Sequence, residues 1–330
     1  MKQDNLLGID VSAKELVVKI KRSGKSYPIV SFENDASGHR KLIRWATKGG
    51  KCARVCVEAT GVYSFELALA LHQNKQTEVM VVNPRALRNF AQALMQRAKT
   101  DPIDAEVAVE FLERMPFQVW EPPRDEVLEL QAITRRILQM KLEINRESNR
   151  LHASLRRPSV SKAISKDIEV NIRHLKRRIE RLEKEGLALI ESVPDLHKKF
   201  KRLVSITGVA TVSAMRILAE IEMLPKDMNP SQWVAHAGLD PRPFESGATI
   251  NKHRHITKAG NKYLRSALYM PALVASQKQE NVKAFYGKLI QKGKRPMQAV
   301  VAVMRKLLHA IWGILHHDQD FDGEKFYKLA

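Results

Sequence analysis

The stretch LLGIDVSAKELVVKI (residues 6–20) predicts two short strands joined by a tight turn. Both runs are apolar and rich in β-branched residues, and the turn-prone residues 12–14 separate them. One residue breaks the pattern, because Asp10 is an acid at the end of an otherwise apolar strand. A loop aspartate would explain it simply, but burying an unpaired carboxylate is costly. Asp10 is therefore a candidate functional residue.

The segments that follow predict a mixed sheet flanked by helices. Residues 27–33 complete an antiparallel meander, and Ser37 is predicted to cap a helix that runs past Trp45 to Gly49-Gly50. A strand (54–60), a helix (65–73), a strand (78–83) and a helix opening at Pro84 come next. The order βββαβαβα is that of the ribonuclease H-like fold. Actin-like sugar kinases also begin with a strand ending near Asp, but they need a glycine-containing turn that Val11-Ser12-Ala13 does not supply.

Three further acids complete a set with Asp10. Glu58 follows the apolar run VCV, and Asp101 and Asp104 lie three residues apart at a predicted helix start, so they share a face. Capping alone could select this last pair, with Asp101 as N-cap, Pro102 at the first helical position and Asp104 in the first turn. Together the four carboxylates suggest divalent metal ions held against a phosphodiester.

The charge of the chain favours a polyanionic partner. Lys and Arg total 56 against 36 Asp and Glu, which gives a net charge of +20 and a pI near 10.0. Residues 1–120 hold 18 basic and 13 acidic side chains, and the rest hold 38 and 23, so the second part supplies most of the positive field. The sequence has neither a run of about 18 apolar residues nor a signal-peptide pattern, so a membrane is the weaker choice of partner.

The two cysteines predict neither a disulfide nor a zinc site. Cys52 and Cys56 lie on a strand approach, where four residues span roughly 13 Å, too far for a disulfide. Two cysteines without partner histidines do not make a zinc site either. We expect reduced thiols in a cytoplasmic protein.

Beyond residue 120 the pattern becomes helical. Residues 125–155 and 167–190 predict two long amphipathic helices, plausible as a coiled-coil hairpin, with ordinary surface helices as the alternative. Their expected apolar faces are Leu128, Ile133, Leu138, Leu142 and Ile144 in the first helix, and Ile168, Ile172, Leu175, Ile179, Leu182 and Leu187 in the second. The chain would then comprise residues 1–120, a linker at 121–192 and a C-terminal domain at 193–330.

The C-terminal segment predicts a helix-hairpin-helix turn and a basic loop. Residues 203–221 place Gly208 in a tight turn between helices, whose backbone N–H groups could hold a phosphate. Ser246 lies in a polar turn, and the residues alone do not mark it as a nucleophile. An apolar final helix (297–315) is expected in a core or a subunit contact. Guesses for nucleic-acid contacts near the two sites are Lys99, Arg242, Lys252, Arg254 and Lys258.

Seven segments in chain order resemble the DEDD transposases of bacterial insertion sequences, the IS-one-ten family of recombinases that a bridge RNA guides. They are GIDVSAKEL (8–16), VCVEATGVY (55–63), VVNPRALRNFAQAL (81–94), KTDPIDAEVAVEF (99–111), SITGVATVSA (205–214), HAGLDPRPFESG (236–247) and TKAGNKYLRSALYMPAL (257–273). The resemblance covers nearly the whole chain. Its departures, such as Pro243-Phe244 before Glu245, touch no position that matches a catalytic residue.

The resemblance implies a fold, a mechanism and partners. It implies an N-terminal domain similar to Holliday-junction resolvases, a coiled-coil linker and a C-terminal transposase domain. By motif, the metal-binding acids are Asp10, Glu58, Asp101 and Asp104, the ion is Mg²⁺ or Mn²⁺, and Ser246 is the nucleophile that forms a covalent phosphoserine. The implied partners are donor DNA, target DNA, a guide RNA and further copies of the chain in a dimer or tetramer, acting at the nucleoid in the bacterial cytoplasm.

Two other functions stay open. A metal-dependent endonuclease of the resolvase type would use the same acids with water as nucleophile and leave Ser246 as turn structure. A non-enzymatic RNA-binding scaffold would use the acids as caps and the basic second half for affinity.

Overall fold

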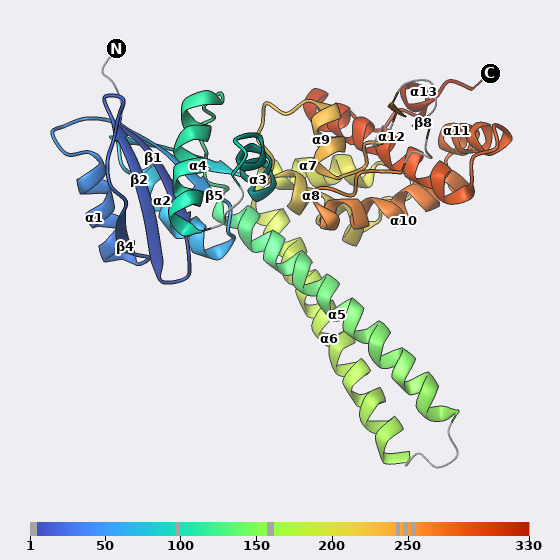
Figure 1. The fold of residues 1–330 in the computed structure, drawn as a ribbon. Helices are drawn as coiled ribbons and strands as arrows, with labels where there is room; N and C mark the ends of the chain where they lie inside the picture. The colour runs from blue at the N-terminus through green and yellow to red at the C-terminus, as the bar shows by residue number, and fades with distance from the viewer. Residues whose placement is uncertain are drawn as a thin grey trace. The chain divides into compact units, whose positions relative to one another are not determined.

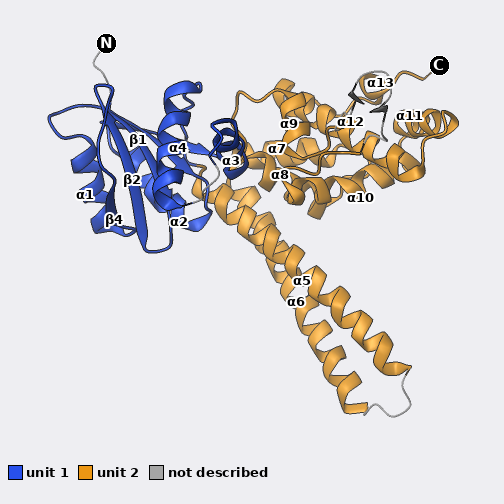
Figure 2. Ribbon diagram, in the orientation of Figure 1, with its two compact units in different colours: residues 1–122 blue, residues 123–330 orange. Residues whose placement is uncertain are grey.

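The chain forms two compact units, residues 1–122 and residues 123–330 (Figure 2). The computed structural model describes residues 5–96, 100–156, 162–241, 245–246, 250–251 and 255–329, with only the backbone at 245–246 and 250–251. Each unit has its own hydrophobic core. The two cysteines are free thiols, as predicted. The separation of the second unit into a linker and a C-terminal domain stays a prediction.

The first unit is built on a mixed sheet, which confirms that part of the predicted fold. Strand order is β3-β2-β1-β5-β6, with β4 paired to β2. β1 runs antiparallel to β2 and parallel to β5, which is in turn parallel to β6. The strands are β1 (Asn5–Val11), β2 (Glu15–Arg22), β3 (Lys25–Ser26), β4 (Val30–Glu33), β5 (Ala53–Glu58) and β6 (Thr77–Val82).

Two local predictions in this unit need correction. The predicted strand 27–33 is shorter and begins at Val30, while β3 forms a separate two-residue pairing before it. Pro28 lies between them and has no N–H to donate to a ladder. The cap of helix α1 (Ala36–Ala46) is Asp35, whose side chain accepts a hydrogen bond from the Gly38 N–H, and not Ser37.

Helices cover both faces of this sheet (Figure 1). Residues Leu7 and Ile9 of β1 pack in a cluster with side chains of α1 and of α2 (Val62–Gln73). Cys56 of β5 packs in a second cluster with side chains of α3 (Pro84–Ala93) and α4 (Asp101–Arg114). Because successive strand residues point to opposite faces, neighbouring residues in β1 and β5 serve different cores.

The second unit opens with a long helical hairpin. Helices α5 (Asp125–Leu155) and α6 (Lys162–Ser192) run side by side, as predicted (Figure 1). The predicted face of α6 contains its buried Leu175 and Ile179, but the predicted face of α5 is partly wrong, since Leu142 is 49% exposed. The residues that α5 buries are Val127, Leu130, Thr134, Ile137 and Met140.

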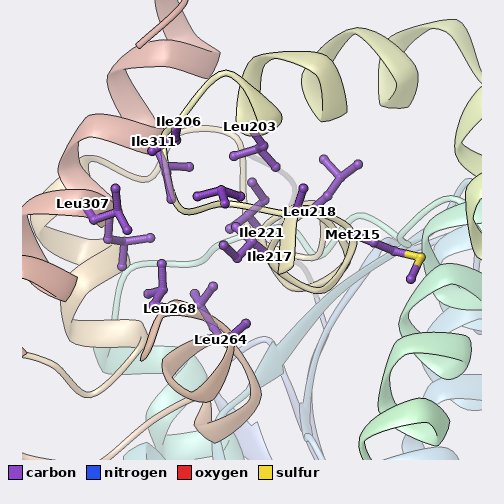
Figure 3. Close-up of a cluster of buried hydrophobic side chains, with 14 of the residues drawn as sticks. Leu203, Ile206, Met215, Ile217, Leu218, Ile221, Leu264, Leu268, Leu307 and Ile311 are labelled. Atoms are coloured by element: carbon purple, nitrogen blue, oxygen red, sulfur yellow. The ribbon is translucent and has the colours of Figure 1, made fainter. Parts of the chain in front are cut away.

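The remaining helices surround one core, part of which Figure 3 shows. Its side chains include Leu203, Ile217, Leu264 and Leu307, from four different helices. The elements are α7 (Pro194–Val204), α8 (Thr211–Ile221), α9 (Pro230–His236), β7 (Glu245–Ser246), β8 (Ile250–Asn251), α10 (Lys262–Lys278), α11 (Glu280–Gln291), α12 (Pro296–His317) and α13 (Gly323–Phe326).

Helix α12 packs in this core, as predicted for the apolar final helix. Val303, Leu307 and Ile311 are fully buried. Within the described part of the chain, α12 is the one helix that is long and apolar enough to cross a membrane by length and composition. A buried core helix passes the same test.

Candidate active site

Asp10 and Glu58 lie side by side at the carboxyl ends of two parallel strands. The β1–β5 register pairs Gly8 with Cys56 and Ile9 with Val57, so the next residues along are Asp10 and Glu58. Carboxyl ends of adjacent parallel strands are a common place for catalytic groups in open α/β sheets.

Both acids belong to the face of the sheet that α4 covers. A Cβ on Gly8 would collide with the backbone of Ala105 and Val109, so glycine is required for this close approach of β1 and α4. Asp10 is two residues beyond Gly8, and Glu58 is two beyond Cys56, which packs against the same helix. Side-chain alternation therefore directs both acids to the α4 face.

Ion pairs between β2 and α4 show which way the helix runs. Lys21, opposite Leu6, lies 2.6 Å from Glu110, and Lys19, opposite Gly8, lies 2.8 Å from Glu106. The direction along β1 toward Asp10 therefore corresponds to the direction along α4 toward its N-terminus. Two strand residues rise about 6.6 Å, close to the rise of four helical residues. The start of α4, with Asp101 and Asp104, is therefore level with Asp10.

The helix start differs in detail from the capping prediction. Thr100 holds the N-cap position and Asp101 is the first helical residue, so Asp101 is not the cap. Asp101 is exposed and Asp104 is half-buried, as are Asp10 and Glu58. Carboxylates in a first turn are stabilised by the helix dipole, which still accounts for part of their placement. Lys99, which precedes them, lies outside the described residues.

The donor set suits a hard divalent cation. Four carboxylates supply oxygen ligands alone, the chemistry that Mg²⁺ and Mn²⁺ prefer. Across the described ranges, no three His, Cys, Asp or Glu side chains converge closely enough to form a metal site as they stand. Burial and the nearby Glu58 charge raise the pKa of Cys56 to about 12, so its thiol stays protonated and is no competing ligand at neutral pH.

A half-buried amide that sequence reasoning missed joins the turn after β1 to the first turn of α2, which follows β5. Asn34 Nδ2 donates to the carbonyl oxygens of Ser12, at 2.8 Å, and Tyr63, at 3.1 Å. His39 Nε2 lies 2.8 Å from Asn34 Oδ1, and His39 is 4% exposed. The signal available in the sequence was only an Asn beside a helix cap.

Replacing Asn34 with alanine is expected to raise the Mg²⁺ concentration for half-maximal strand cleavage by about 10-fold, because the loops beside the acids lose their shared anchor. Asn5→Ala is the matched control, since it removes a different amide hydrogen bond, to the Ala46 carbonyl, at the opposite end of β1. Metal titration of cleavage checks this. Equal shifts in both variants would show a general loss of stability instead.

Ser246 belongs to the second unit and lies in a short hairpin. Ser246 in β7 pairs with Ile250 in β8. At the base of this segment, Thr257 Oγ1 donates to Asp240 Oδ1 at 2.6 Å and its N–H donates to the Asp240 carbonyl at 2.9 Å. Asp240 and Thr257, on either side of the segment that contains Ser246, are thus bonded to one another, and the role of Ser246 as a nucleophile stays a prediction. Arg242, Lys252 and Arg254 lie outside the described residues.

The two other proposed nucleic-acid contacts have defined surroundings. Lys258 adopts a left-handed conformation with φ of 51°, and its N–H donates to the Gly238 carbonyl. Gly208, with φ of 98°, turns between α7 and α8, where a Cβ would meet the backbone of Pro271 and Ala275. Close packing against α10 is a sufficient reason for this glycine, and the phosphate contact stays a prediction.

A buried carboxylate beside the cap of α10 was also missed. Glu220 of α8 is 2% exposed and accepts hydrogen bonds from Arg135 Nε, at 2.9 Å, and Nη2, at 3.0 Å. Asn261 Nδ2 also donates to Glu220, at 2.7 Å, and Asn261 caps α10 where the chain arrives from the Ser246 hairpin. The acid in the apolar run MRILAEI (215–221) was the available signal, by the same reasoning that identified Asp10.

Comparisons with known proteins match both units. A DEDD-type transposase model of the IS110 group matches residues 7–158, and a model described as "Transposase IS116/IS110/IS902 family" matches residues 200–287. The pilin gene-inverting proteins of Moraxella bovis and Moraxella lacunata are each 28% identical over 322 residues, which covers 96% of this chain and 97% of theirs. An uncharacterized 42 kDa protein of insertion element IS900 from Mycobacterium paratuberculosis is 26% identical over 148 residues, 42% of this chain and 37% of that protein.

The fold and these matches define a DNA recombinase of the transposase class, with a DEDD-type domain at its N-terminus. The chain belongs to the IS110 family of insertion-element transposases. DNA is the substrate class that this activity implies, and DEDD transposases typically use divalent metal ions. Both matched ranges agree with the resemblance found in the sequence.

Proposed function

We propose that this transposase joins donor and target DNA by RNA-guided strand exchange through a covalent phosphoserine. The observation that carries the proposal is the β1–β5 register, which brings Asp10 beside Glu58 on the face where α4 begins with Asp101 and Asp104. This arrangement supports a ribonuclease H-like catalytic domain. Ser246, in a hairpin anchored at its base, supplies the nucleophile.

In this mechanism, the Ser246 Oγ attacks a DNA phosphorus and a deoxyribose oxygen leaves. The phosphoserine keeps the energy of the phosphodiester, so a second strand can displace the serine and reseal without ATP. Asp10, Glu58, Asp101 and Asp104 would hold Mg²⁺ or Mn²⁺, which when bound would stabilise the charge that develops on the phosphate.

Sequence recognition is proposed to reside in a guide RNA that pairs with both DNA partners. The protein then needs contacts to shape and backbone rather than a base-reading helix. The excess of basic over acidic residues beyond residue 120 supports such contacts. We further propose that the chain acts as a homo-oligomer in the cytoplasm and that α5 and α6 form a coiled-coil linker.

The test is detection of a protein–DNA adduct on a denaturing gel. Purified protein is mixed with RNA transcribed from DNA flanking its gene, labelled donor and target DNA, and Mg²⁺. We expect a protease-sensitive adduct that Ser246→Ala abolishes. The matched control is Ser266→Ala, because that hydroxyl lies in the same unit and receives a bond from Arg216.

Two outcomes would overturn the mechanism. Metal-dependent cleavage without an adduct, unchanged in Ser246→Ala, would indicate a hydrolytic nuclease of the resolvase type, which the four acids alone could support. RNA binding with no cleavage of DNA at all would indicate a scaffold.

A further inference from the structure

Helix α6 has a basic outer face that the recombination mechanism does not use. Its buried residues Leu175, Ile179 and Ile190 lie on one side and join the core. At 100° per residue, five exposed cations of α6 fall on the opposite side, and a sixth, Lys176, is exposed at the edge of that side. We call this set the basic ridge: Lys162, Lys166, Arg173, Lys176, Arg177 and Lys184.

The charges of the basic ridge are not neutralised by neighbours. Among the described side chains, no ion pair involves a ridge residue. Other cations of the hairpin are paired, as in Lys141–Glu183 at 3.0 Å, Arg150–Glu147 at 2.6 Å and Arg181–Glu185 at 3.5 Å. Glu169, Glu180 and Glu191 share the ridge face, so six basic residues stand against three acids. A solvated helix without a partner usually intersperses both signs more evenly.

Three cations gather near the centre of the ridge. Arg173, Lys176 and Arg177 line a surface hollow of about 350 Å³. These three residues follow the i, i+3, i+4 spacing that brings side chains together on one helix face. Guanidinium and ammonium groups that lie together on one face are the side chains that contact backbone phosphates.

The length of the ridge fits a backbone rather than a small anion. From Lys162 to Lys184 the helix rises about 33 Å, at 1.5 Å per residue. Lysine and arginine side chains along a straight helix can contact successive phosphates but do not read bases. The partner should therefore be a nucleic acid held by its backbone.

We propose that the basic ridge binds the backbone of the guide RNA. Naming RNA rests on the proposed function. Gly186 of α6 packs against Met215 of α8, and Lys176 lies about 15 Å farther along the helix, with Lys162 about 36 Å away. DNA strands in exchange must reach Ser246, beyond α8 and α9 in the chain. The basic ridge extends away from α8 along α6. This position suits the guide RNA, which stays bound throughout strand exchange and is never cut.

The test compares two triple variants in RNA binding. The ridge variant is Arg173→Gln, Lys176→Gln and Arg177→Gln. The control is Lys141→Gln, Arg150→Gln and Arg181→Gln, which removes the same charge from ion-paired positions of the same hairpin. Binding of labelled RNA, transcribed from the flanking DNA, is measured across salt concentrations in the Ser246→Ala background.

We expect the ridge variant to bind RNA at least about 20-fold more weakly near 0.1 M salt. Its slope of log affinity against log salt should fall by about 2 to 3, close to one for each phosphate that the variant no longer neutralises. The control should retain both affinity and slope. Helix content by circular dichroism should be equal in the two variants, which separates binding from folding.

Three results would overturn the proposal: equal losses of affinity in both variants, loss of duplex DNA affinity with RNA affinity unchanged, or no RNA binding by the parent protein. None of these readouts requires strand cleavage. A failed adduct assay with an intact ridge effect would reject the serine mechanism and leave the ridge as an RNA site.

Discussion

Replacing Asp10 with asparagine is expected to reduce DNA cleavage and adduct formation by at least about 100-fold. Asparagine keeps the size of the side chain but removes the negative charge that would hold a divalent cation beside Glu58. Folding should not suffer, because carboxylates gathered at one site repel one another without a cation. Single-turnover cleavage measures the first effect and thermal unfolding the second.

Thermal unfolding also reports on metal binding without any cleavage. Mg²⁺ should raise the Tm of the parent protein and leave that of Asp10→Asn nearly unchanged, since a ligand stabilises only the state that binds it. Glu78→Gln is the matched control, because it removes a carboxylate that lies exposed on the same sheet and pairs with Arg54. Full activity in Asp10→Asn would remove the acids from the mechanism.

Mixing variants asks whether one active site uses two copies of the chain. Asp10→Asn and Ser246→Ala proteins are each expected to be inactive, and their mixture should regain activity if the acids and the serine of one site come from different subunits. Failure of the mixture to regain any activity would favour a site within one chain.

The sequence predicted most of what positions the acids. Apolar runs interrupted by one carboxylate identified Asp10 and Glu58, and the structure places both at adjacent strand ends. A single-residue anomaly in a buried run is a local signal, so it survives without tertiary knowledge. The position of α4 along β1 could not be predicted. It depends on the close approach at Gly8 and on ion pairs between residues almost 90 positions apart.

The errors have a common cause in tertiary packing. Helix α5 has more apolar positions than one face can hold, and contact with α6 and α8 selects Ile137 and Met140 and leaves Leu142 exposed. Glu220 carried the same local signal as Asp10, an acid in an apolar run, but its partners Arg135 and Asn261 are far away in sequence and could not be predicted. Ser246 is the reverse case: its turn carries no physical signal for a nucleophile, and only its resemblance to a family motif selected it.

The Arg135–Glu220 pair is expected to show strong coupling in a double-mutant cycle. Glu220 is almost fully buried, whereas the Arg135 side chain is 35% exposed and lies over the Tyr263 ring at 4.3 Å. Removing one member leaves the other without its charge partner. Arg135→Met and Glu220→Met should therefore each lower the free energy of unfolding by about 3 kcal/mol.

The double variant should be destabilised by much less than the sum of the single effects. An apolar pair of similar volume replaces a buried ion pair at little net cost, although Asn261 still loses an acceptor worth about 1 kcal/mol. We expect a coupling free energy of at least about 1.5 kcal/mol, since the groups are in direct contact.

Urea unfolding followed by helical circular dichroism measures this coupling free energy, with Lys141→Met and Glu183→Met as a control pair from the more exposed part of the hairpin. Additive losses of stability at Arg135 and Glu220 would mean that their interaction contributes nothing beyond the separate residues. Strong coupling would instead show that this ion pair stabilises the contact between α5 and α8, next to the cap of α10.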